Sequence, residues 1–263
     1  IFLLLLWGQV FPQIEAVGNQ IVKEKIKEHI LILASDSLEG REVGEPGELM
    51  AADYISNYFK HIGIPPYKDS TYYQEVPLKK NIIGGVSISN RKSVYLKINE
   101  KQYEFKEDFY TYPSYEQARI RSKDILFLGY GIDSENYSDY NTNVEGRVIV
   151  IFDEEPMDKS GNYLVSGNKE KSPESYWKNK LNTAKEKGAK AVLIITKNYN
   201  SSYETAEHKI EHPGVSLLSQ EEPIPFFFIS HKIANDILGK NRISKIKKRI
   251  TTKKRTVNKL INK

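Results

Sequence analysis

The chain of 263 residues contains no cysteine. This absence excludes a disulfide framework, a thiol nucleophile and a zinc site with cysteine ligands, although it does not define the cellular compartment. Long apolar runs are also missing, so we expect no transmembrane segment. No serine stands in a Gly-x-Ser-x-Gly pattern, which leaves a serine hydrolase without support. With 39% hydrophobic and 28% charged residues, the composition is that of a globular protein.

A short apolar run, IFLLLLW, occupies residues 1–7 and is followed by small residues at Ala16 and Gly18. It is too short to span a bilayer, but it is typical of the hydrophobic part of a secretory signal that lacks its Met and basic start. We therefore expect residues 1–18 to be a truncated signal peptide, and the protein to be secreted or periplasmic. The alternative is a buried strand or helix end.

The formal net charge of +5 is distributed unevenly along the chain. Residues 240–263 contain 11 Lys or Arg and no acidic residue, and the rest of the chain has 28 basic against 34 acidic residues. The body is thus mildly acidic, and we expect no nucleic-acid partner. In the basic tail, Ile243, Ile246 and Ile250 have helical spacing, which predicts a short amphipathic helix. The alternative is that this tail binds nucleic acid or anionic lipid.

Hydrophobic periodicity predicts the following elements. Helices are expected over residues 14–33, from Pro46 to the stop at Gly63, from about Trp177 to the stop at Gly188, and over 231–238. Strands are expected over 72–78, 85–89, 93–98, 101–106, 124–128, 147–152, 191–196 and 224–230. The continuous apolar runs at 124–128 and 147–152 indicate strands that are buried on both faces. The fold class is therefore α/β.

A charged, glycine-rich loop joins the first two helices, in the stretch LASDSLEGREVGEPGELMAADYI at residues 33–55. This stretch resembles the N-terminal signature of the exported co-catalytic zinc aminopeptidases, metallopeptidase family twenty-eight. Downstream, ILFLGYGI, VEGRVIVIFDEEP, KLNTAKEKGAKAVLIIT and IPFFFIS resemble, in this order, the protease-associated domain that is inserted into many of these enzymes.

The resemblance implies a domain organisation. Residues 1–18 would be the signal, 19–83 the N-terminal helical part of the peptidase α/β domain, 84–237 the inserted protease-associated domain, and 238–263 a basic return segment towards the catalytic domain. The complete enzyme would hydrolyse peptides from the N-terminus with two zinc ions. Its partners would be a peptide or protein substrate and the missing catalytic domain.

The zinc-binding residues of this family have no counterpart in the sequence. The family places a His-x-Asp motif after the insert and further acidic and histidine ligands beyond it, whereas none of the five histidines here precedes x-Asp: His29, His61, His208, His212 and His231. We therefore predict no catalytic, cofactor-binding or metal-binding residue in this chain, and expect the chain alone to be inactive. The alternative function is a non-catalytic protein-interaction module, a free-standing protease-associated domain.

Two short motifs invite a catalytic interpretation that their surroundings do not favour. His208-Lys-Ile-Glu-His212 fits the inverted zinc-protease pattern, but the preceding residues indicate a loop, so we expect a chance match on the surface. Gly129-Tyr-Gly131, followed by Asp153, half-matches a dinucleotide fingerprint. However, Ser134 replaces the third glycine and no helical pattern follows, so we expect a turn.

Three polar clusters remain with two interpretations each. Asp153, Glu154 and Glu155 suggest acid–base chemistry or calcium binding, but we expect a solvated loop after a strand. The tyrosines of residues 107–117 could line a peptide-binding surface or pack at a sheet edge, and the sequence does not separate these. Glu39 and Arg41 could pair with each other or with the missing domain; we favour a structural loop whose glycines and ion pair set the start of the second helix.

Overall fold

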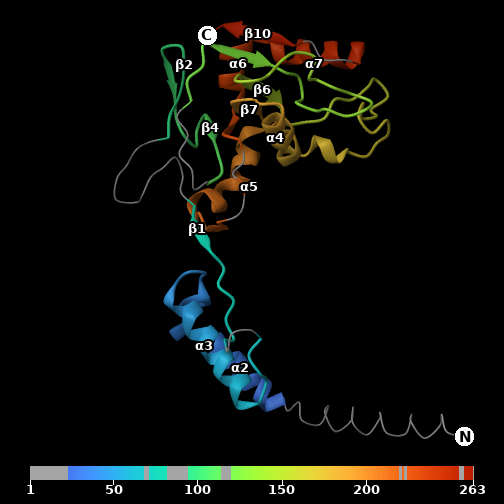
Figure 1. The fold of residues 1–263 in the computed structure, drawn as a ribbon. Coiled ribbons are helices and arrows are strands. Elements are labelled where there is room, and N and C mark those ends of the chain that lie inside the picture. The colour runs from blue at the N-terminus through green and yellow to red at the C-terminus, as the bar shows by residue number, and fades with distance from the viewer. Residues whose placement is uncertain are drawn as a thin grey trace, which may run out of the picture. The chain divides into compact units, whose positions relative to one another are not determined.

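The computed structural model of the chain describes residues 23–67, 71–81, 94–113, 120–218, 221, 224–254 and 258–262. The chain divides into two compact units, Ile1–Val76 and Pro77–Lys263, which are described separately (Figure 1). The predicted signal peptide, the first part of the first predicted helix and the predicted strand 85–89 lie outside the described residues.

The first unit is a pair of helices. α2 (Lys23–Leu33) is followed by the 3₁₀ segment η1 (Asp36–Arg41) and by α3 (Pro46–His61). As predicted, α3 begins at a proline, which needs no hydrogen-bond acceptor there, and ends before a glycine with φ of +77°. The two helices contact each other through His29, whose Nδ1 lies 2.6 Å from the hydroxyl of Tyr54 and whose ring packs edge-on against Tyr58.

A six-stranded sheet forms the centre of the second unit, in the order β10-β5-β6-β7-β9-β4. The four inner strands are parallel, and both edge strands run antiparallel to their neighbours. The bounds are β4 (Phe109–Tyr110), β5 (Asp124–Phe127), β6 (Val148–Phe152), β7 (Ala191–Ile195), β9 (Phe226–Ile229) and β10 (Lys259–Asn262). Apart from Asp124 at the start of β5, the inner strands are apolar because helices cover both faces of the sheet.

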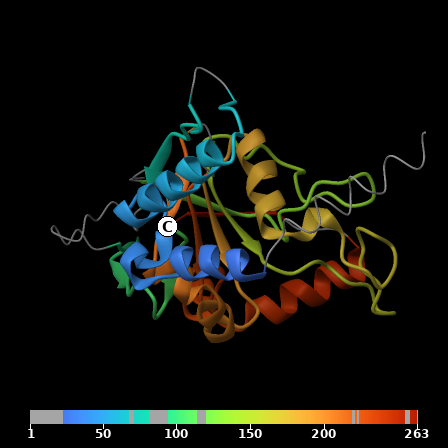
Figure 2. The ribbon, with the colours of Figure 1, turned by 90° about the horizontal axis from the view of Figure 1, so that it is seen from below.

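Successive residues of the inner strands point to opposite faces of the sheet, so they belong to two separate hydrophobic cores. On one face, Val150 and Leu193 pack against α6 (His231–Leu238) and α7 (Arg242–Lys253). On the other face, Ile151 and Ile194 pack against α4 (Trp177–Glu186) and α5 (Tyr199–Glu211). Figure 2 shows α4 and α7 on opposite sides of the strands. The unit is therefore a three-layer α/β/α arrangement, and the α/β prediction is confirmed.

Two small antiparallel sheets complete the unit. β1 (Leu78–Lys80) pairs with β8 (Val215–Leu217), and β2 (Leu96–Ile98) pairs with β3 (Lys101–Tyr103). The strand expected over 72–78 is wrong, because only Leu78 of that range is in a strand. The amphipathic helix predicted in the basic tail is confirmed as α7. None of the helices in the described ranges is both long and apolar enough to cross a membrane.

Candidate functional site

The carboxyl ends of the parallel strands bring polar side chains together, at the edge where open α/β sheets commonly bind ligands. Asp153, Thr196 and Ser230 directly follow β6, β7 and β9. The backbone N–H of Asp153 donates to Ile195 O (3.0 Å) and that of Thr196 to Ile229 O (3.4 Å), so the three residues lie side by side. The hydroxyls of Thr196 and Ser230 are buried and have no hydrogen-bond partner within the described ranges.

The side chain of Lys180, on α4, extends to the carboxyl end of β6. Its side chain is fully buried, and its Nζ donates to the carbonyl oxygens of Phe152 (2.9 Å), Asp153 (3.0 Å) and Glu154 (2.7 Å). Burial lowers the pKa of Lys180 to about 8, and the carboxylate of Asp153 opposes that shift. All three ammonium protons are engaged with backbone oxygens, so the group clamps α4 to the end of β6 and is not free to act as a nucleophile.

The acidic cluster after β6 is only partly solvated: Glu155 is buried, whereas Asp153 and Glu154 are half-buried, so the prediction of a solvated loop is wrong for Glu155. Glu155 is 4% exposed and accepts a hydrogen bond from the backbone N–H of Ser172 at 2.9 Å. Glu154 pairs with Lys247 of α7. Burial raises the pKa of Asp153. The positive charges of Lys180 and Lys247 oppose this rise in the pKa of Asp153.

The turn after β5 is also a closed structure. Gly129 and Gly131 both have φ of +68°. The buried carboxylate of Asp139 accepts hydrogen bonds from the backbone N–H groups of Tyr130 (2.9 Å) and Ile132 (3.2 Å), and from the hydroxyl of Tyr137 (2.7 Å). The N–H groups that would have to face a pyrophosphate already face a carboxylate. The prediction of a turn is confirmed.

The two histidines of the inverted zinc-protease pattern lie at the end of α5, where a loop was expected: His208 is in the last turn of the helix and His212 directly follows it. That expectation was wrong. The rings of His208 and His212 stack with centroids 4.7 Å apart, but Glu211 forms an ion pair with Lys106 at 2.8 Å. Across the described parts of the chain, no three His, Asp or Glu side chains are grouped so that they could hold a metal ion. The pair therefore lacks the third protein ligand of a catalytic zinc site.

The tyrosines that follow residue 107 pack against the sheet. Tyr110 is buried and stacks on Phe228 with ring centroids 4.8 Å apart, and Tyr112 stacks on Trp177 at 5.5 Å. Tyr115 lies outside the described residues. For the two described tyrosines, the structure therefore favours packing at the sheet edge over a peptide-binding surface.

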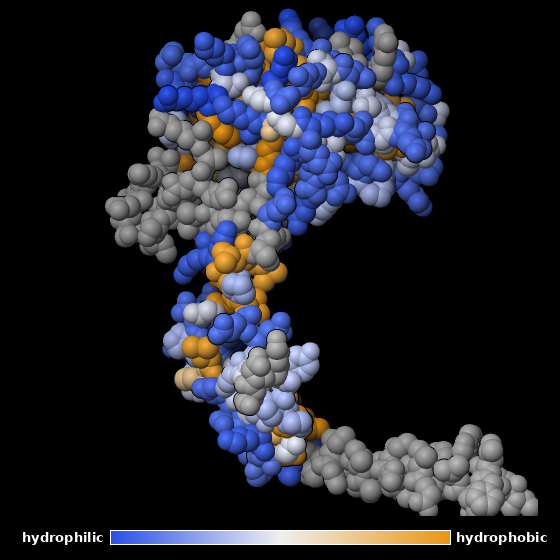
Figure 3. Space-filling model, in the orientation of Figure 1, coloured by the Kyte–Doolittle hydropathy of each residue, from blue (hydrophilic) through white to orange (hydrophobic). Residues whose placement is uncertain are grey.

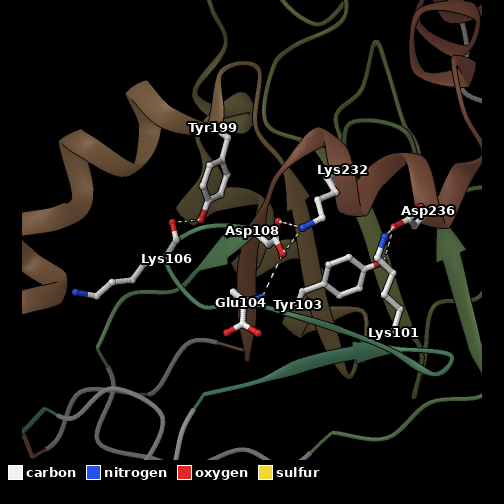
Figure 4. Close-up of polar contacts among 8 residues, drawn as sticks. All are labelled: Lys101, Tyr103, Glu104, Lys106, Asp108, Tyr199, Lys232 and Asp236. Atoms are coloured by element: carbon white, nitrogen blue, oxygen red, sulfur yellow. Dashed lines mark hydrogen bonds and ion pairs between the residues drawn. The ribbon is translucent and has the colours of Figure 1, made fainter.

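A polar network joins the segment before β4 to the helices (Figure 4). Lys232 of α6 contacts both carboxylate oxygens of Asp108 at 2.8 and 2.9 Å. The hydroxyl of Tyr103 donates to Asp236 at 2.8 Å, and that of Tyr199 donates to the carbonyl of Lys106 at 3.0 Å. Each group has a protein partner, so we assign this network to the positioning of β2, β3 and β4.

The glycine-rich loop of the first unit has an unusual backbone. A Cβ atom on Gly47 would lie 1.9 Å from the carbonyl oxygen of Leu38, so no other residue fits where α3 crosses η1. The backbone of Glu39 and Arg41 is in the left-handed region, with φ of +47° and +58°, and both side chains are exposed. Among the described residues they form no ion pair with each other. The glycine contact, rather than an ion pair, fixes the loop.

Comparisons with known proteins leave the family open. No family model and no curated protein matches the sequence. Among solved structures, the chain is similar to an aminopeptidase from Aneurinibacillus sp. strain AM-1, with a TM-score of 0.38 and 16% sequence identity. The match covers 91% of this chain and 43% of that one, so the chain spans less than half the length of the aminopeptidase. A likeness this remote establishes neither family nor activity.

Proposed function

We propose that this chain is the N-terminal part of an exported zinc-dependent aminopeptidase. In this proposal the first unit belongs to the catalytic α/β domain, and the second unit is an inserted protease-associated domain that shapes substrate access or protein contacts. The observation that carries the proposal is the apolar surface of the helix pair, together with the glycine-rich loop that joins the two helices.

The described residues of the first unit do not cover the apolar side chains of the helix pair. No side chain of α2 is buried in the described structure. Ile30 is 59% exposed, Leu31 62% and Leu49 68%, and Figure 3 shows apolar atoms on the surface of this unit. Soluble proteins rarely leave such surfaces uncovered. We propose that the sheet of the catalytic domain covers them.

The zinc ions of this proposal do not fit the residues at hand. All five histidines lie in the described ranges, and these ranges contain no group of three or more potential metal ligands. We therefore assign no step of peptide hydrolysis to this chain, and place the zinc ligands in the proposed catalytic domain. When bound there, the zinc ions would supply an activated hydroxide.

The test compares this chain with the longer product of its gene. The coding sequence after Lys263 should encode a His-x-Asp motif, and the longer product should release N-terminal residues from peptides in a zinc-dependent way. Hydrogen exchange should show α2 and α3 protected in the longer product and poorly protected in this chain alone. A coding sequence without that motif, or an inactive zinc-loaded product, would overturn the proposal.

A second candidate function is a non-catalytic protein-interaction module. It is favoured by the second unit, whose sheet is buried on both faces by helices of the same unit. Under this alternative the chain should be monomeric and should unfold in one cooperative transition that includes α2 and α3. Aggregation, or exchange of α2 and α3 long before the sheet, would contradict it.

A further inference from the structure

The basic helix α7 is fixed in orientation by its apolar side. Ile250 is 1% exposed and belongs to the hydrophobic core between the sheet and the helices α6 and α7. Ile243 and Ile246 pack against the same core. Lys247 adds an ion pair to Glu154, and its Nζ lies 4.8 Å from the ring centroid of Phe152. Because the apolar face of α7 packs against the core of its own unit, this face is not available to insert into a membrane or to bind a partner.

The opposite side of α7 is a continuous cationic face. It consists of five exposed side chains: Arg242, Lys245, Lys248, Arg249 and Lys253. At 3.6 residues per turn they span about 140° of the helix circumference. None of the five has an ion-pair partner in the described part of the chain. No acidic residue lies between Asp236 and residue 263.

We propose that this cationic face docks the protein on an anionic lipid surface through the phosphate-bearing headgroups. Each cation held near such a surface strengthens binding by about fivefold. Lipid is favoured over nucleic acid because α7 has no aromatic side chain on which a base could stack, and no Asn or Gln within it to read base edges. The contact is electrostatic and lies at headgroup level, and it does not depend on the proposed peptidase function.

The test measures sedimentation of the full chain with vesicles of phosphatidylcholine, with and without phosphatidylglycerol. The variant Lys245→Gln/Arg249→Gln removes two charges from the centre of the face with little change in helix propensity. We expect it to bind anionic vesicles about 30-fold more weakly. The control Lys197→Gln/Lys209→Gln removes two exposed charges elsewhere in the second unit and should bind as the parent does. Thermal unfolding checks that both variants are folded.

Several outcomes would overturn the proposal. Equal binding to neutral and anionic vesicles would assign adsorption to the apolar helix pair of the first unit. Equal weakening in both variants would reduce the effect to net charge. Tighter binding to duplex DNA than to anionic vesicles at the same salt would identify nucleic acid as the partner. Supporting results are binding that requires phosphatidylglycerol, falls with salt and is lost only in the α7 variant.

Discussion

Replacing Lys180 by methionine tests whether the buried ammonium holds the second unit together. Methionine has a similar volume and is apolar, so the substitution removes the charge and its three hydrogen bonds without opening a large cavity. The carbonyl oxygens of Phe152, Asp153 and Glu154 would lose their partner at the end of β6.

The expected change in the free energy of unfolding is the difference between two opposing effects. Three charge-assisted hydrogen bonds contribute about 1.5–3 kcal/mol each. The fall in pKa from 10.5 to about 8 corresponds to about 3 kcal/mol, which is the cost of burying the charge less its attraction to nearby carboxylates, and this is recovered on substitution. The net expectation is a free energy of unfolding lower by about 3 kcal/mol. With a urea dependence of about 2 kcal/mol per molar, the midpoint falls by about 1.5 M.

Urea unfolding of the full chain, followed by circular dichroism and fluorescence, measures this change. Lys185→Met is the matched control on the same helix, because Lys185 forms an exposed pair with Glu221 and should cost less than about 1 kcal/mol. A Lys180→Met variant as stable as the parent, or an equal loss of stability in both variants, would contradict a stabilising role for the buried ammonium.

The pH dependence gives a second, independent readout. Between pH 8 and 10.5 the folded parent releases the proton of Lys180 while the unfolded chain retains it. The unfolded state then binds more protons, so the stability of the parent relative to Lys180→Met should rise with pH in this window, by up to about 1.4 kcal/mol per pH unit. A flat or falling difference would contradict the lowered pKa.

Three further predictions concern the second unit. Asp139→Ala should lower the free energy of unfolding by about 3–5 kcal/mol, because two buried backbone N–H groups and a tyrosine hydroxyl lose their hydrogen-bond acceptor. The control Asp133→Ala breaks a partly exposed ion pair with Lys187 and should lower it by about 1 kcal/mol or less in the same urea titration. Tyr140→Phe should leave the melting temperature unchanged or raise it, since that hydroxyl has no partner among the described residues, whereas Tyr103→Phe loses a bond to a carboxylate and should lower it. Burial raises the pKa of Tyr130 and of other buried tyrosines, so the unfolded state ionises first and stability should fall as pH rises above about 10. Because deprotonation of Lys180 has the opposite effect up to pH 10.5, the test uses Lys180→Met, and urea midpoints of this variant that stay constant from pH 9 to 11 would contradict the prediction.

The central strands could be predicted from local pattern alone. Residues 125–128 and 148–152 are apolar throughout, and only a strand covered on both faces needs such a run. The helix α3 was predictable for a similar reason, since Pro46 and Gly63 mark its two ends by backbone chemistry that does not depend on the rest of the fold.

The helix α5 was missed although its pattern is present. Its inward positions are Tyr199, Tyr203, Ala206 and Ile210, spaced by four, three and four residues, and Asn198 accepts a hydrogen bond at its start. Two of these inward residues are tyrosines among serines and asparagines, so the segment resembled a loop. Counting tyrosine as apolar would have identified the helix.

The buried polar groups could not have been found in this way. Lys180 is one of several lysines in α4 and its flanks, and Asp139 lies in a loop rich in polar residues. Their burial depends on where α4 and the end of β6 meet, and on how the turn after β5 closes over a carboxylate. No periodicity within a helix or loop records such contacts.

The sequence by itself determined the α/β class, the inner strands, the ends of α3 and the separation of positive charge into the last 24 residues, because each depends on neighbours along the chain. Tertiary structure alone decided which charges are buried, which histidines stack and where the sheet ends. The edge strand β10, for example, pairs Lys259 with Phe127. Contacts between such distant residues depend on the whole packed sheet, so no local pattern specifies them.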